Sequence, residues 1–456
     1  MIRIAALTAS LLLAAVCFAD DAQAQDFAPC DVDPAFPELL GSQCVTVEAP
    51  LDHARPDTGR VELFVRKFPA VSSRRGQIWL VAGGPGESGA AFYPFLDTLH
   101  EAFPHHDLIV PDHRGTGNSS KLCPMQESAE SPDGMGLAGE EWGPCIGAFY
   151  QDQARAQAFT ITNAAHDLAL LIGRYREAEE VQVYGVSYGT QLVLRMMRVA
   201  PPELDGIVLD GLIPPETAPQ WDLGHRTAVI DTVGRTLLNA EQEAAYAALL
   251  AGVTPDTPWL EQVPGRDVRR FMGTLLTFPS LRARIPPIVD ELSRGDTATL
   301  DRTRADLMAL VGDLGRYPQS SPSLPLVMLI SGSENNGRRD LDDITVAAEA
   351  KDALFVSPLP GFLAANPLPL YERDEWFGRA PASLPRTLVI HGTLDPNTPY
   401  AGAVAHVAQL RETGPVRLST IEGGAHFLLF AAPRCFVATA GTFIGGADAP
   451  GACVAE

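Results

Sequence analysis

The chain has 456 residues, of which 46% are hydrophobic and 20% are charged, and this composition excludes a disordered or low-complexity protein. Its length is that of roughly two or three structural units with a large buried core. The formal net charge is −22. Such an acidic surface repels phosphate backbones and anionic lipids, so nucleic acid is not expected as a partner. The sequence does not indicate an oligomeric state.

The N-terminal segment has the pattern of an export signal. Arg3 precedes a short apolar run over residues 4–16, and a small-x-small cleavage motif ends at Ala24. The run is shorter than the about 20 residues of a membrane-spanning helix, so no membrane insertion is expected. We therefore predict a signal peptide over residues 1–24 and a secreted or periplasmic protein. A lipoprotein anchor at Cys17 and a buried N-terminal helix are the alternatives.

Of the seven cysteines, all but Cys17 remain after this cleavage, and an even number is typical of disulfides in exported chains. Their proximity in sequence favours three local pairs, although other pairings are possible. The predicted disulfides are Cys30–Cys44, Cys123–Cys145 and Cys435–Cys453. No two cysteines have the close spacing of a zinc motif, so we predict no metal site.

Short apolar runs alternate with helix-like segments along most of the chain. This pattern predicts βαβ units and an α/β fold with a mostly parallel central sheet flanked by helices. Residues 161–177 carry apolar side chains at the spacing of one helix face. The expected strands cover residues 78–81, 107–110, 181–184, 207–209, 388–390 and 416–421.

The stretch from about 213 to 384 differs from the rest. It is proline-rich near both ends and contains helix-like segments such as 241–250 and 300–311, with a strand pattern only at 326–330. We therefore predict a mainly helical cap inserted into the core. A separate C-terminal domain is the alternative, but the two strands after residue 385 alone would make too small a sheet. The predicted units are a core over 25–212, a cap over 213–384 and the rest of the core over 385–456.

The segment 185–189 reads Gly-Val-Ser-Tyr-Gly and fits the pattern G-x-S-x-G between a predicted strand and a helix-like run. In this setting a serine occupies a tight turn that projects its hydroxyl from the sheet edge, where flanking glycines avoid collisions. The N-terminus of the following helix favours negative charge that develops there. We therefore predict Ser187 as a nucleophile.

A serine nucleophile needs a base, and the base needs an orienting acid. Asp395 and His426 each follow a predicted strand and complete the chain order serine, acid, histidine. His391 lies at the very end of its strand, so we interpret it as structural. Asp112 and Asp210 also end strands, and we interpret them as acceptors that anchor loops.

An oxyanion hole requires two backbone donors near the nucleophile. The N–H of Tyr188, directly after the serine, is one candidate. The second would come from the glycine-rich loop 82–86, which follows the strand at 78–81. Glycine there lets an amide approach a substrate oxygen closely.

Together these motifs resemble the α/β-hydrolase fold and, more narrowly, the proline iminopeptidase and tripeptidyl aminopeptidase family of serine exopeptidases. The resemblance covers most of residues 44–456, and the piece with Cys435 and Cys453 is similar to the tail of the exported tripeptidyl aminopeptidase branch. It depends on residues 83–86, 112–119, 185–189, 394–399 and 424–426.

The resemblance implies Ser187 as nucleophile, Asp395 as acid and His426 as base, with Gly84 and Tyr188 as oxyanion donors and no cofactor. One position departs from the family, because Ala82 stands where a histidine commonly precedes the two glycines.

The family also implies that an acidic residue of the cap binds the free amino group of the substrate. Glu334 and Glu216 are the candidates, and a solvated surface glutamate is the alternative for both.

The predicted function is that of a secreted serine hydrolase that forms an acyl-enzyme. The resemblance implies an aminopeptidase that acts on short peptides with a free N-terminus. A cap would narrow the entrance and exclude folded proteins. An esterase or lipase with the same catalytic residues is the close alternative. A binding protein on a hydrolase scaffold without catalysis is the more distant one.

Overall fold

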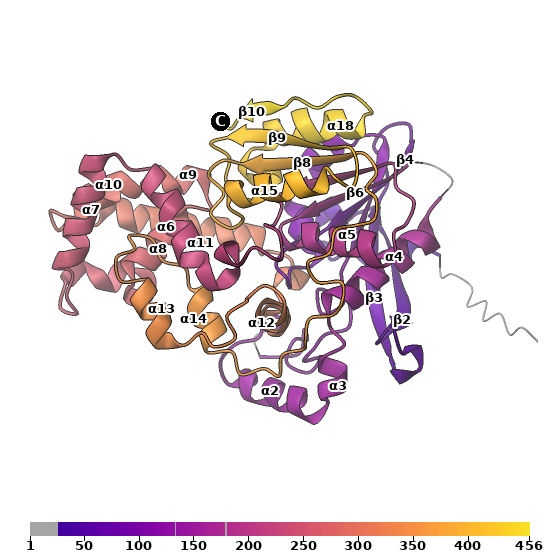
Figure 1. Ribbon diagram of the computed structural model, residues 1–456, viewed down its shortest axis with the longest axis horizontal. Coiled ribbons are helices and arrows are strands. Elements are labelled where there is room, and N and C mark those ends of the chain that lie inside the picture. Colours follow the sequence, from indigo (N-terminus) through magenta and orange to yellow (C-terminus); the bar gives the residue numbers. More distant parts are fainter. Residues whose placement is uncertain (1–25, 133, 178–179) are drawn as a thin grey trace, which may run out of the picture.

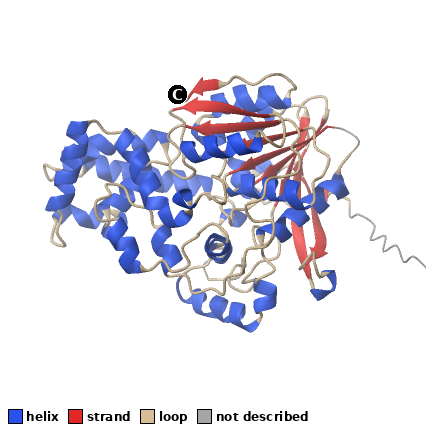
Figure 2. Cartoon of the chain, viewed as in Figure 1, coloured by secondary structure: helices blue, strands red, loops and turns tan. Residues whose placement is uncertain are grey.

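The computed structural model describes residues 26–132, 134–177 and 180–456. The predicted export signal, residues 1–24, lies outside the described residues. The described chain forms one ten-stranded sheet with helices on both faces (Figure 2). In the order of the sheet, the strands are β1 (Ala28–Pro29), β2 (Gln43–Pro50), β3 (Arg60–Phe68), β5 (His106–Pro111), β4 (Gly76–Val81), β6 (Glu180–Val186), β7 (Gly206–Asp210), β8 (Thr387–Gly392), β9 (Val416–Glu422) and β10 (Ala452–Val454).

The sheet is antiparallel at one edge and parallel elsewhere. The pairs β1–β2, β2–β3 and β3–β5 are antiparallel, and every pair from β5 to β10 is parallel. Strands β4, β5 and β8 are buried along their whole length, as expected for parallel strands covered on both faces. The six strands predicted outside the cap are present, and the predicted α/β fold with a mostly parallel sheet is confirmed.

Two hydrophobic clusters cover the two faces of the sheet. Helices α4 and α5 pack on one face through residues such as Leu168 and Leu192, and helix α1 and the C-terminal helices cover the other through Leu99 and Phe436. The helices of the core are α1 (Leu96–Ala102), α2 (Trp142–Gln151), α3 (Gln153–Ala156), α4 (Ile161–Tyr175), α5 (Tyr188–Val199), α15 (Tyr400–Leu410), α16 (Leu428–Ala431), α17 (Pro433–Phe436) and α18 (Thr442–Ile444).

Between β7 and β8 the chain is described without a gap, and it forms helices and no strand of the sheet. We call this stretch, residues 211–386, the cap. Helices α6 to α11 gather beside the sheet in Figure 1 and enclose a hydrophobic cluster of their own, which includes Phe271 and Ile285. The cap helices are α6 (Arg226–Thr236), α7 (Ala240–Gly252), α8 (Val268–Leu275), α9 (Pro279–Arg282), α10 (Ile285–Leu292), α11 (Ala298–Leu314), α12 (Leu324–Ser333), α13 (Asp343–Glu349) and α14 (Leu359–Ala364).

One predicted strand is wrong. The apolar run 326–330 lies in helix α12, which the side chain of Ser323 caps by accepting a hydrogen bond from the N–H of Leu326 (3.4 Å). The helix is buried almost all round, so it lacks the one-sided apolar pattern that identifies a surface helix. A short apolar run without that pattern does not distinguish a strand from a buried helix.

The structure joins the cysteines as Cys30–Cys44, Cys123–Cys145 and Cys435–Cys453, the three pairs predicted from sequence proximity. The last of them ties the C-terminal strand β10 to helix α17. Disulfides of this kind are typical of proteins outside the cytoplasm. Among the described residues, none of the helices combines the length and the hydropathy that a membrane crossing needs.

Candidate active site

Ser187 occupies the sharp turn between β6 and α5, with backbone angles φ 55° and ψ −123° that are unusual for any residue except glycine. Steric collisions explain why glycine flanks the turn at positions 185 and 189. A Cβ on Gly189 would lie 2.3 Å from the carbonyl oxygen of Val81, and one on Gly185 would lie 2.8 Å from the carbonyl oxygen of Gly189. The turn therefore has the geometry that the sequence pattern predicts.

The structure brings Asp395 and His426 together. The Nδ1 atom of His426 lies 2.7 Å from Oδ2 of Asp395, and both side chains are buried. The Asp395 carboxylate also accepts hydrogen bonds from the backbone N–H groups of Asn397 (2.7 Å) and Thr398 (2.8 Å). The hydroxyl of Thr398 donates a further bond to Oδ2 (2.8 Å). These donors hold the carboxylate in one orientation toward the imidazole.

The charges of this pair support each other. Burial acts to raise the pKa of Asp395, but the positive charge of His426 and the hydrogen bonds outweigh it and hold the pKa below its usual range. Burial acts to lower the pKa of His426, but the Asp395 carboxylate outweighs this effect and raises it. An imidazole that becomes positively charged during a reaction is therefore stabilised at this position.

The strand-end residues that we interpreted as structural hold loops in the structure. Asp112 accepts hydrogen bonds from the N–H groups of Gly89 (2.7 Å) and Asn118 (2.8 Å). The Nε2 atom of His391 lies 2.8 Å from the carbonyl oxygen of Thr398, in the loop that carries Asp395. Burial lowers the pKa of His391, which favours the neutral imidazole.

The glycine-rich loop after β4 lies beside Ser187. A Cβ on Gly83 would lie 3.1 Å from Cβ of Ser187, and both Gly84 and Tyr188 line the cavity at the serine. The N–H of Ser323, at the start of α12, donates a 2.9 Å hydrogen bond to the carbonyl oxygen of Gly86. The cap therefore contacts the predicted oxyanion loop directly.

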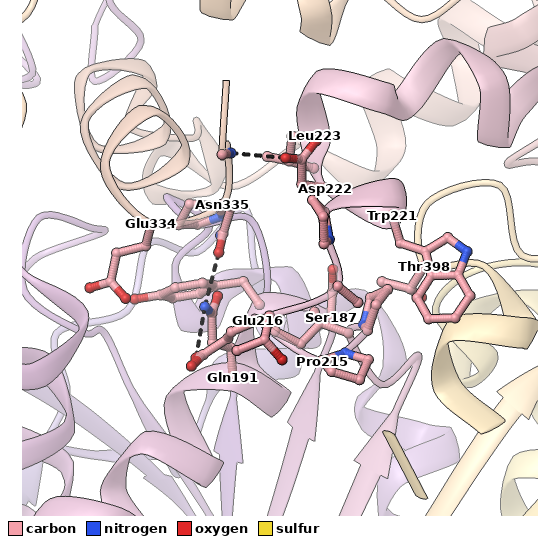
Figure 3. Close-up of a pocket in the computed structure, with 18 of the residues that line it drawn as sticks. Ser187, Gln191, Pro215, Glu216, Trp221, Asp222, Leu223, Glu334, Asn335 and Thr398 are labelled. Atoms are coloured by element: carbon pink, nitrogen blue, oxygen red, sulfur yellow. Dashed lines mark hydrogen bonds between the residues drawn. The ribbon is translucent and has the colours of Figure 1, made fainter. Parts of the chain in front are cut away.

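A cavity of about 400 Å³ opens above Ser187, between the C-terminal edge of the sheet and the cap. This edge is where parallel α/β sheets bind their ligands. Figure 3 shows Gln191 on the cavity wall, hydrogen-bonded to Glu216 (3.2 Å) and Asn335 (2.9 Å). The wall is mainly apolar near Pro215 and Trp221 and carries charged side chains elsewhere.

Neither predicted glutamate is solvated, so that alternative is wrong for both. The side chains of Glu216 and Glu334 are 2% and 1% exposed, and both residues line the cavity. Arg195, two turns after Ser187 in α5, pairs with both of them, at 2.7 Å to Glu334 and 3.3 Å to Glu216. This buried arginine explains how two acidic groups can remain inside the protein.

Three charged residues near Ser187 were missed from the sequence. Arg195 gave no signal of its role, because a charged residue in a helix is usually solvated. Arg226 lines the cavity and donates a hydrogen bond to Asn397 (3.1 Å), and burial lowers its pKa to about 10. Glu87 follows the glycine-rich loop, and one of its carboxylate oxygens would lie 3.1 Å from a Cβ on Gly83. Its position directly after the loop 82–86 was the only available sign.

Comparisons with known proteins agree with this architecture. A family model described as "alpha/beta hydrolase fold" matches residues 78–249, and a model described as "TAP-like protein" matches residues 367–452. The chain has the α/β-hydrolase fold. Its C-terminal part is of the TAP-like type, as the sequence motifs predict.

Two relatives match this hydrolase over most of its length, and a third matches a short stretch. Serine protease Hip1 of Mycobacterium tuberculosis is 24% identical, with 90% of this chain and 86% of that protein covered. Tripeptidyl aminopeptidase of Streptomyces coelicolor is 22% identical, with 93% and 84% covered. Carboxylesterase B of Mycobacterium tuberculosis is 34% identical, but only over 98 residues, or 20% of this chain. The fold and these relatives support a serine hydrolase.

Proposed function

We propose that this hydrolase is a secreted or periplasmic serine aminopeptidase that acts on short peptides with a free N-terminus. Ser187 attacks the scissile carbonyl while His426 takes its proton, and Asp395 orients the imidazole. The N–H groups of Gly84 and Tyr188 stabilise the oxyanion, His426 returns the proton to the leaving amine, and water then releases the acyl group. The hydrogen-bonded Asp395–His426 pair beside the cavity of Ser187 is the observation that carries this proposal.

The substrate's ammonium group would bind at Glu334 rather than at Glu216. The Glu216 carboxylate already accepts four hydrogen bonds, from Gln191, Arg195, Arg198 and the N–H of Gly378. A carboxylate has about four acceptor positions, so Glu216 is saturated.

From the residues that the structure describes, Glu334 accepts only two hydrogen bonds, from Arg195 (2.7 Å) and from the hydroxyl of Tyr371 (3.1 Å). It therefore has room for an ammonium donor. Burial raises the pKa of Glu334, whereas the pKa of Glu216 is lowered to about 2, because the charges of its two arginines outweigh burial. The present partners of Glu334 compensate its negative charge less completely than the two arginines compensate that of Glu216. An ammonium ion would therefore stabilise the ionised form of Glu334.

Turnover of peptide arylamides with free and with acetylated N-termini tests the function. We expect acetylation to lower kcat/KM by about tenfold or more, since it removes a charged hydrogen bond. Covalent labelling by a fluorophosphonate should be lost in Ser187→Ala. Equal turnover of both arylamides would favour an esterase-like acyl hydrolase, and absence of labelling in folded protein would favour a binding protein.

Two matched variants test the choice of glutamate. Glu334→Gln should remove most of the preference for the free N-terminus. Glu216→Gln should mainly lower the melting temperature, because it leaves buried Arg198 without a carboxylate partner. The assignment is reversed if Glu216→Gln removes the preference in a protein of unchanged melting temperature.

A further inference from the structure

Glu87 is a carboxylate without a partner beside the proposed nucleophile. One of its oxygens and Cβ of Ser187 each lie 3.1 Å from the position of a Cβ on Gly83, so the two atoms are at most 6.2 Å apart, twice that distance. Glu87 accepts no hydrogen bond and forms no ion pair with any residue that the structure describes. It differs in this respect from Glu216 and Glu334, which arginines neutralise.

Glu87 is exposed at the surface, and one of its carboxylate oxygens lies close to Gly83 and Ser187. Its surroundings remove enough water that burial raises the pKa of Glu87, and the charge of His426 acts in the opposite direction. A partly desolvated carboxylate without a counter-ion is unfavourable, and a cation bound beside it relieves this penalty. The position beside Glu87 is therefore suited to a positively charged group.

Two observations place the Glu87 carboxylate on the histidine side of Ser187. Glu87 is not one of the described residues that line the 400 Å³ cavity, where Glu334 lies. The charge of His426 acts on the pKa of Glu87. In a serine hydrolase the histidine hands its proton to the leaving group, so the leaving group departs on the histidine side. If the acyl part of a peptide fills the cavity, the departing part passes Glu87.

We propose that Glu87 forms a subsite for a cationic side chain on the first residue of the leaving peptide. This inference rests on the proposed aminopeptidase function and adds a preference to it. A lysine or arginine directly after the cleaved bond would pair with the carboxylate at Glu87, and a glutamate there would be repelled. Glu334 and Glu87 would then bind positively charged groups of the substrate on opposite sides of the scissile bond.

Competing peptides with a free N-terminus test the subsite. Mass spectrometry first locates the bond that the wild-type protein cleaves, and the residue after that bond is then varied among lysine, norleucine and glutamate. We expect kcat/KM for lysine to exceed that for norleucine by about tenfold, with glutamate lowest. In Glu87→Gln the ratio of lysine to norleucine should approach one, and Glu87→Asp should keep part of it.

The exposed Glu101 on α1 provides a matched control, because Glu101→Gln removes the same charge away from the site and should keep the wild-type ratio. Melting temperatures verify that each variant is folded. The subsite is overturned if the wild-type ratio is near one, if Glu87→Gln keeps it, or if that variant lowers all three rates equally. These outcomes are separate from failure of the aminopeptidase function, which would appear as equal turnover of free and acetylated peptides.

Discussion

The backbone N–H of Ser187 donates a 2.9 Å hydrogen bond to the carbonyl oxygen of Asp210. The carboxylate of Asp210 in turn accepts hydrogen bonds from the N–H of Leu428 (3.0 Å) and from the hydroxyl of Tyr184 (2.8 Å). Leu428 lies two residues after His426. One aspartate at the end of β7 therefore connects the turn of the proposed nucleophile with the loop of the proposed base.

Replacement of Asp210 should change how stability depends on pH. Burial raises the pKa of Asp210 to about 6, against 3.8 for an ordinary aspartate. The folded protein thus binds this proton more tightly than the unfolded chain, so the stability that Asp210 contributes falls as the pH rises from about 4 to about 6. Relative to Asp210→Asn, the wild type should lose about 3 kcal/mol over this window.

Urea unfolding of both proteins at several pH values measures this difference. Asp57→Asn, at an exposed position, serves as the control and should follow the wild type at every pH. A constant difference between the wild type and Asp210→Asn across the window would contradict the raised pKa.

The proposed base makes a prediction about the pH profile of activity. Because Asp395 raises the pKa of His426, kcat/KM should rise with pH through an apparent pKa above the ordinary 6.5 of a histidine. Asp395→Asn removes the charge that opposes burial, so the acidic limb should move to lower pH. At the same time kcat should fall by about 10³- to 10⁴-fold. An acidic limb that stays in place would assign it to another group.

The strained turn at Ser187 predicts that stability and activity change in opposite directions. Glycine adopts the φ of 55° without strain, whereas alanine retains a Cβ and with it most of the strain. We expect Ser187→Gly to be more stable than Ser187→Ala by about 1 kcal/mol, with both inactive. Chemical denaturation of the two variants measures the difference. A lower stability of Ser187→Gly would show that this backbone conformation is not strained.

Substitution of two helical glycines, one closely packed and one in open space, tests the tight packing behind Ser187. Gly189→Ala should destabilise the protein by about 3 kcal/mol, because its Cβ would lie 2.3 Å from the carbonyl oxygen of Val81. Gly173 in α4 has open space around the same position, and Gly173→Ala should stabilise the protein by about 0.5–1 kcal/mol. Thermal unfolding distinguishes the two, and equal effects would contradict the close approach of α5 to β4.

The sequence predicts the central sheet well, because its parallel strands are buried on both faces and appear as continuous apolar runs. The antiparallel strands β2 and β3 were missed, although alternating Val45, Val47 and Ala49 in β2 carried the signal of a strand with one buried face. The run at 326–330 was assigned to a strand because a fully buried helix shows no periodicity.

The residues of the site could be predicted where a chemically reactive side chain directly follows a recognisable strand. Ser187, Asp395 and His426 each follow a strand that reaches the same edge of the sheet, so their positions follow from strand order. The partners of Glu216 and Glu334 could not be predicted, because Arg195 meets them only after the cap folds back onto α5. Such contacts depend on tertiary packing that no local pattern encodes.

The N–H of Ser323 donates a hydrogen bond to Gly86 in the glycine-rich loop, and the hydroxyl of Ser88, two residues after the loop, donates one to Gln319 (2.6 Å), so the cap is joined to this segment at two points. This part of the cap therefore cannot swing open without displacing the loop beside Ser187. Exchange of caps between related enzymes would alter reaction chemistry and substrate range together, unless the new cap preserves both junctions.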